Sequence, residues 1–215
     1  MKTTLDSTQA VEQITTLFQS LQRLAPTRNI KAARKIERQI VPLVHSVAAQ
    51  WPNTSAHADA LFYYECTLLA LSRMTRRKDV SGRLRDAAYK LGAQSVDIRL
   101  KGKRDLGTGF ATYNLAIDLI GSHNQPALGL QYMLKARRIL KALPANQLPR
   151  SFQFFWIEYG IAKAYRDLGQ TEKSARQLKR TLGPVLSAYD FGDLRGIAKC
   201  AELLAEIDID RRSKK

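Results

Sequence analysis

Residues 156–182, WIEYGIAKAYRDLGQTEKSARQLKRTL, have the pattern of two helices joined by a tight turn. The small Ala162 lies on the apolar stripe of the first half, between two tyrosines at helical spacing. Gly169 supplies the turn, and the small Ser174 comes early in the second half, one turn before Leu178. Small residues let two helices approach closely, while aromatic side chains fill the space beside them. The stretch therefore predicts an antiparallel helical hairpin.

The rest of the chain repeats this alternation of helical stripes and breaks, and it shows no convincing period-two pattern of a β-strand. The sequence predicts an all-α fold of about nine helices. Short turns between paired helices fall near residues 28, 79, 124 and 169, at intervals of 51, 45 and 45 residues. A regular interval in this range is typical of helical-hairpin repeats, although an irregular all-α globule is the alternative. We expect a single helical-repeat domain over residues 1–215, with hairpins over 5–50, 55–100, 108–143 and 150–186, a C-terminal capping helix over 190–210 and a short basic tail over 211–215.

Local signals place several helix boundaries. Asp6, followed three residues later by Gln9, predicts a capping box at the first helix. Pro42 should kink or split the second helix because it lacks a backbone N–H. Residues 100–109, LKGKRDLGTG, are expected to form a loop, and Asn124 is expected to cap the helix that begins near Pro126.

The stretch from Trp156 to Leu182 resembles a tetratricopeptide repeat, through Ala162, Gly169 and Ser174. The third hairpin is more loosely similar. Its matching residues are Asn124, Gly129, Met133 and Ala136. The resemblance implies hairpins stacked in a right-handed superhelix, with first helices lining a concave groove and second helices forming the convex back. The intervals here exceed the usual repeat of about 34 residues, so the helices are longer or the loops carry insertions.

The charge of the chain is strongly unbalanced. Its 35 Lys and Arg against 19 Asp and Glu give a formal net charge of +16, which favours acidic or polyanionic partners. The stretch from Ser72 to Arg104 alone holds eleven basic and three acidic residues. Two distant cysteines, no signal-peptide pattern and no apolar run long enough to span a bilayer predict a soluble cytoplasmic protein.

Residues suited to catalysis are few. The three histidines, His45, His57 and His123, form no HExxH motif and no cluster with metal-ligand spacing. A nucleophile elbow and a phosphate-binding P-loop are absent as well. We therefore expect a protein that is not an enzyme and has no catalytic residues, no cofactor and no metal.

Two interpretations of the binding surface stay open. In the first, an adaptor or regulator holds a partner protein segment or acidic peptide in the concave groove. The groove residues would be Tyr63, Tyr113, Asn114, Tyr159, Lys163 and Arg166. In the second, a basic surface binds DNA or RNA through phosphates, independently of sequence. That surface would consist of Arg73, Arg76, Arg77, Arg83, Lys101, Lys103, Arg104, Lys135, Arg138, Lys173, Arg176 and Arg180.

Overall fold

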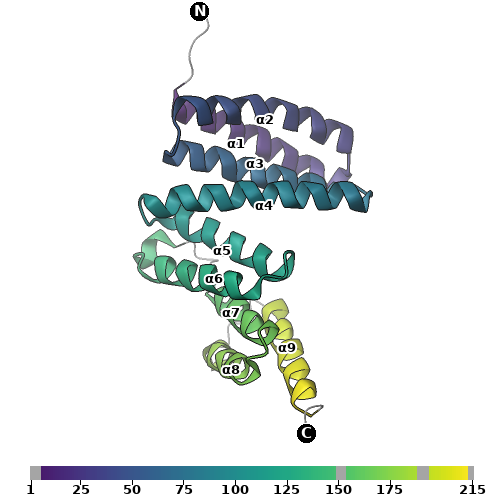
Figure 1. The fold of residues 1–215 in the computed structure, drawn as a ribbon, viewed down its shortest axis with the longest axis vertical. Helices are drawn as coiled ribbons and strands as arrows, with labels where there is room; N and C mark the ends of the chain where they lie inside the picture. Colours follow the sequence, from purple (N-terminus) through teal and green to yellow (C-terminus); the bar gives the residue numbers. More distant parts are fainter. Residues whose placement is uncertain (1–5, 149–153, 188–193, 213–215) are drawn as a thin grey trace, which may run out of the picture. The chain divides into compact units, whose positions relative to one another are not determined.

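The computed structural model describes residues 6–148, 154–187 and 194–212. Within these residues it contains nine α-helices and no strand, which confirms the all-α prediction (Figure 1). The helices are α1 (Ser7–Leu24), α2 (Ile30–Gln50), α3 (Ser55–Met74), α4 (Lys78–Lys101), α5 (Leu106–Gly121), α6 (Pro126–Lys141), α7 (Phe155–Asp167), α8 (Thr171–Ser187) and α9 (Leu194–Arg212).

The helices form two compact units. The N-terminal unit is Met1–Arg104 and the C-terminal unit is Asp105–Lys215. The boundary falls in the short loop between α4 and α5, where the helix pattern is interrupted. The single domain over residues 1–215 stays a prediction.

Four helices make up the N-terminal unit. α3 packs against both helices of the preceding hairpin, α1 and α2, and also pairs with α4. Ile14, Ile40 and Val47 are completely buried in one core cluster, while Leu21 and Leu71 are completely buried in a second. The apolar stripes of the amphipathic helices therefore meet in the interior of the unit, as their spacing predicts.

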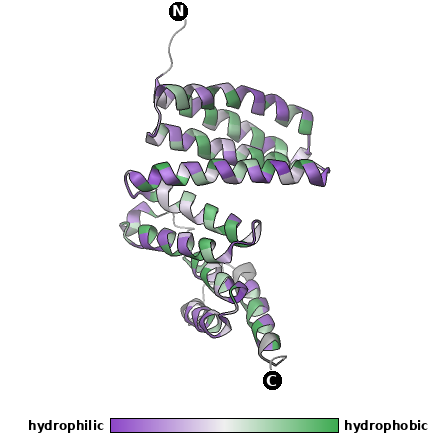
Figure 2. Ribbon diagram, in the orientation of Figure 1, coloured by the Kyte–Doolittle hydropathy of each residue, from purple (hydrophilic) through white to green (hydrophobic). Residues whose placement is uncertain are grey.

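The C-terminal unit follows the same packing rule. α7 packs against both α5 and α6, and α9 packs against both α7 and α8. Figure 2 shows that α5 is mostly white and green, whereas purple, hydrophilic residues are frequent on α8. α5 therefore contributes mainly core residues, and α8 contributes one apolar stripe and a wide polar face. This arrangement of neighbouring helices is compatible with a helical repeat fold.

The crossing of α7 and α8 confirms the hairpin predicted over residues 156–182. Ala162 and Ser174 are both completely buried, and the Ser174 hydroxyl donates a hydrogen bond to the Ala162 carbonyl oxygen at 2.7 Å. Gly169 has a φ of +71°, in the left-handed region where glycine carries no side-chain penalty. The first part of the hairpin predicted over 150–186 and the start of the helix predicted over 190–210 lie partly outside the described residues.

Several predicted boundaries are confirmed or corrected. The capping box is present: the Asp6 carboxylate accepts from the Gln9 N–H at 2.8 Å, and the Gln9 side chain accepts from the Asp6 N–H at 3.3 Å. The prediction that Asn124 caps α6 is wrong. Asn124 instead has a φ of +49° in the turn, and the residue before α6 is Gln125, whose side chain makes no cap bond. Asn tolerates the left-handed conformation better than most residues, which explains its place there.

Two expected breaks are smaller than predicted. α2 continues through Pro42, whose exposed ring lies opposite the buried Ile40 and Val44, so the missing N–H removes one bond without splitting the helix. The loop expected over residues 100–109 is confined to the four residues between Lys101 and Leu106. α5 starts early because the Asp105 carboxylate accepts from the Thr108 N–H at 2.8 Å. At the C-terminus, α9 extends to Arg212, two residues into the predicted tail.

Candidate functional site

Positive charge is concentrated on one class of helix. The second helices of the four hairpins, α2, α4, α6 and α8, hold 18 Lys and Arg and five Asp and Glu, a net charge of +13. The first helices, α1, α3, α5 and α7, hold four basic and six acidic residues, a net charge of −2. α9 holds four of each. Most of the surplus of +16 therefore lies on the second helices.

All twelve residues of the predicted basic surface are exposed. They are Arg73, Arg76, Arg77, Arg83, Lys101, Lys103, Arg104, Lys135, Arg138, Lys173, Arg176 and Arg180. The first three lie at the end of α3 and in the turn to α4, whereas Lys101, Lys103 and Arg104 lie at the far end of α4. With 24 residues, α4 separates these two groups by about 36 Å. They are two patches rather than one site.

Part of this surface is neutralised by a carboxylate. Asp79 accepts from Arg77 at 2.9 Å and from Arg83 at 3.3 Å, and the hydrogen bond from Arg77 lowers the pKa of Asp79 below its ordinary value. A carboxylate that holds two guanidinium groups competes with any anionic ligand for them. The stretch from Ser72 to Arg104 therefore offers less free charge than its composition indicates.

The six predicted groove residues are all half-buried, and the structure places them in both units. Tyr63 lies on α3 in the N-terminal unit, where its ring centroid is 5.8 Å from that of Phe18. Tyr113 and Asn114 lie on α5. Burial raises the pKa of Tyr113 to about 12, so its phenol is part of the packing of the C-terminal unit.

The remaining groove residues, on α7, are engaged within the C-terminal unit. Tyr159 packs against the core that α9 shares with α7 and α8, and burial raises its pKa. Lys163 pairs with Asp167 at 2.6 Å, and Arg166 pairs with Glu206 of α9 at 3.0 Å. The space beside α7 that a partner segment would need is therefore filled by α9.

Two surface depressions are lined by basic residues, one in each unit. The depression on α8 has a volume of about 440 Å³, and the depression on α2 has a volume of about 340 Å³. The α8 depression is lined by Tyr165, Lys173, Arg176, Gln177, Lys179 and Arg180. The α2 depression is lined by Ile30, Lys31, Arg34, Lys35 and Arg38. Both present several cations to solvent from a single rigid helix.

The α2 residues were absent from the basic surface predicted from the sequence, as was Lys179. The signal that identifies them is spacing. Lys31, Arg34, Lys35 and Arg38 stand at i, i+3, i+4 and i+7, which places them on one helical face.

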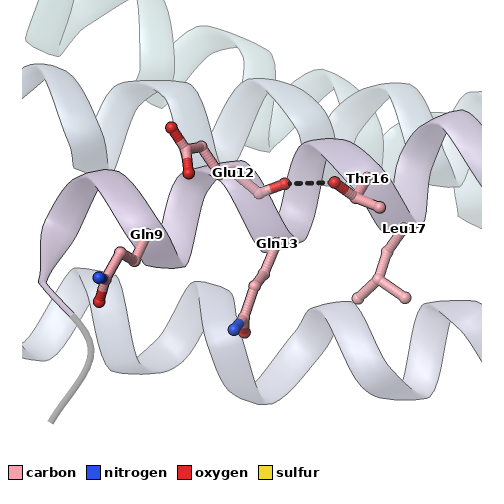
Figure 3. Close-up of a pocket in the computed structure, with 5 residues that line it drawn as sticks. All are labelled: Gln9, Glu12, Gln13, Thr16 and Leu17. Carbon is pink, nitrogen blue, oxygen red and sulfur yellow. Dashed lines mark hydrogen bonds between the residues drawn. The ribbon is translucent and has the colours of Figure 1, made fainter.

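A third depression lies along α1 and is lined by no basic residue. It has a volume of about 670 Å³ and is lined by Gln9, Glu12, Gln13, Thr16 and Leu17. Figure 3 shows Gln9, Gln13 and Leu17 pointing to one side of the helix, as their spacing of four residues requires. The Thr16 hydroxyl donates to the Glu12 carbonyl oxygen at 2.9 Å and is therefore already satisfied within the helix.

Clusters suited to metal binding are not found in the described part of the chain, where no three His, Cys, Asp or Glu side chains gather. His57 is buried near the start of α3, and its Nδ1 accepts from the Asn53 N–H at 3.2 Å. Cys200 is buried, and burial raises the pKa of its thiol to about 11, which disfavours the nucleophilic thiolate. Each of these groups has a structural explanation.

Among the described residues, no helix combines the length and apolar character that crossing a membrane requires. Comparison of the chain with models of known protein families and with curated proteins found no match.

Proposed function

We propose that this chain is a non-enzymatic binding protein that holds nucleic acid through the phosphate backbone, independently of base sequence. The observation that carries the proposal is the separation of charge between helices: +13 on the second helices of the hairpins and −2 on the first. A net charge of magnitude about 2 to 8 is sufficient to keep a small domain soluble. The surplus on the second helices exceeds that need.

The chemistry of the second helices favours phosphates over an acidic protein. Protein interfaces depend on a few anchor residues, most often Trp, Tyr or Arg, in well-packed pockets that exclude water. In the described residues the large exposed hydrophobic side chains are Ile117, Leu128 and Ile209. Leu128 lies on α6, and none of the three lies on α2, α4 or α8. Many exposed Lys and Arg with few exposed apolar side chains suit a ligand whose charge repeats and whose affinity comes from released counterions.

The hairpins themselves support a tetratricopeptide-like packing within each unit. The buried pair Ala162 and Ser174 brings α7 and α8 close together, and α3, α7 and α9 each contact both helices of the hairpin before them. In this arrangement the second helix of a hairpin keeps one long face in solvent. We propose that these solvent faces carry the function.

The test is a titration of the purified protein with a fluorescent duplex at salt concentrations between about 50 and about 200 mM. Binding that is tight at low salt and falls by about a thousandfold over this range would support the proposal, since each phosphate contact contributes about −0.9 to the slope of log affinity against log salt. Scrambling the base sequence should leave the affinity unchanged. Absence of binding at the lowest salt would end the nucleic-acid proposal.

A second candidate function is supported by the depression on α1. Its lining is polar and apolar without basic residues, and its volume of about 670 Å³ is large enough to receive side chains of a partner segment. A photo-reactive amino acid at Gln13, inside the depression, should then crosslink to one protein, whereas the same probe at Gln22, exposed on α1 outside it, should not. Equal crosslinking from both positions would exclude this candidate.

A further inference from the structure

The two basic depressions are built from eight-residue segments that are identical at four positions. α2 carries KAARKIER over residues 31–38, and α8 carries KSARQLKR over residues 173–180. The two segments share Lys, Ala, Arg and Arg at the first, third, fourth and eighth positions, with Ile against Leu at the sixth. The shared alanines, Ala33 and Ala175, are buried at 0% and 4% exposure, and the first and last basic residues of both segments are exposed. The fourth position differs, since Arg34 is half-buried and Arg176 is exposed.

The buried and exposed halves of this pattern have different explanations. Ala33 and Ala175 let each second helix approach its neighbours, which is a packing requirement. Packing does not require Lys31 or Arg38, which are exposed, or their counterparts Lys173 and Arg180. A match at these exposed positions in two separate units therefore points to a ligand that both faces bind.

The cations of the two segments are largely uncompensated. On α2 only Arg34 is in an ion pair, with Glu37 at 2.6 Å, and the other three basic residues make none within the described residues. On α8 none of the four basic residues is in an ion pair in the same part of the chain. The ring of Tyr165 lies 5.7 Å from the Lys173 ammonium group and holds it at one edge of the α8 depression.

α6 provides an internal comparison. Residues 134–141, LKARRILK, share the central Ala-Arg and a basic last residue with the other two segments. Here Arg137 and Lys141 both bind Glu158 of α7, at 3.0 and 3.4 Å. Two of the four cations of α6 thus hold helices together, while most of those of α2 and α8 are exposed and unpaired among the described residues.

The spacing of the cations fits a phosphate backbone. From the first to the last basic residue each segment rises about 10 Å, at about 1.5 Å per residue. One strand of duplex DNA places a phosphate about every 3.4 Å along its axis. Each segment can therefore face about three consecutive phosphates of one strand.

We propose that residues 31–38 and 173–180 are two phosphate-binding sites, one in each unit, which share exposed basic residues at the first and last positions and supply most of the contacts to nucleic acid. This inference rests on the proposed function. It localises that function to two of the four second helices and predicts that α4 contributes little.

The experiment compares three full-length triple variants with the wild type on one long duplex. Lys31, Lys35 and Arg38 change to Ala in the first, and Arg176, Lys179 and Arg180 change to Ala in the second. The matched control changes Lys78, Arg85 and Lys90 of α4 to Ala. All nine residues are exposed and each variant loses three positive charges.

The measured quantity is the slope of log affinity against log salt. Each of the first two variants should lower its magnitude by about 2.7, which corresponds to three contacts, and the control should lower it by less than about 1. Circular dichroism melting checks that every variant folds. If an Ala variant unfolds, Gln replacements of the same three residues keep the long side chains and remove the same charge.

The outcomes separate this inference from the proposed function. Equal losses in all three variants, or a loss in only one of the two segments, would overturn the paired sites while leaving nucleic-acid binding in place. A wild type that binds no duplex at low salt would overturn both.

Discussion

Replacing Ala162 with Phe should strongly destabilise the C-terminal unit. Ala162 is completely buried where α7 crosses α8, and its carbonyl oxygen accepts the Ser174 hydroxyl at 2.7 Å. A phenyl ring at this position cannot fit without separating the helices. Overpacking of this kind costs on the order of 1–3 kcal/mol, and loss of the buried hydrogen bond adds about 1 kcal/mol.

The expected total is about 2–4 kcal/mol. In a chain of about 150–250 residues each kcal/mol lowers the melting temperature by about 2–4 °C, so the variant should melt about 4–16 °C below the wild type. The assay is thermal unfolding followed by circular dichroism. Ala205→Phe, at an exposed position of α9, is the matched control and should change stability by less than about 0.5 kcal/mol. An unchanged melting temperature for Ala162→Phe would refute the close crossing.

Two further predictions concern single buried positions, one in each unit. Burial lowers the pKa of His57 in the folded protein, so the unfolded chain binds a proton at this position more readily than the folded one. The contribution of neutral His57 to the free energy of unfolding should therefore be fully present above pH 6.5, the ordinary pKa of histidine, and be lost as the pH falls through the lower pKa of the folded state. Chemical denaturation between pH 7 and pH 5 should show this loss, and His57→Gln should reduce it while His45→Gln, at an exposed position, should not. Gly129→Ala should destabilise the C-terminal unit although alanine favours helices by about 1 kcal/mol, because its Cβ would lie 2.5 Å from Cγ1 of Ile120 and 3.1 Å from the Ala116 carbonyl oxygen. A denaturation midpoint at or above that of the wild type would contradict the close contact between α5 and α6.

Helix positions could be predicted from the sequence because apolar spacing, caps and turn residues are local signals. The capping box at Asp6 and the buried pair of Ala162 and Ser174 were both recognisable in this way. Asn124 was misassigned because Asn serves equally well as a helix cap and as a left-handed turn residue, and only the backbone conformation decides between them.

The candidate site was harder to predict, because the role of a basic side chain on a helix depends on which side chains of other helices lie beside it. Arg137 and Arg176 are equivalent in the sequence pattern, yet the first is bound to Glu158 and the second lines an open depression. Ion pairs between residues distant in sequence, such as Arg166 with Glu206, likewise depend on packing that spacing does not reveal. The exposed basic residues were predictable, but which of them are uncompensated was not.

The most direct test of the account is the salt dependence of wild-type binding to a long duplex. About six phosphate contacts, three for each of the segments 31–38 and 173–180, predict a slope of log affinity against log salt of about −5. A slope near zero, or no binding at low salt, would contradict the claim that the basic second helices bind a phosphate backbone.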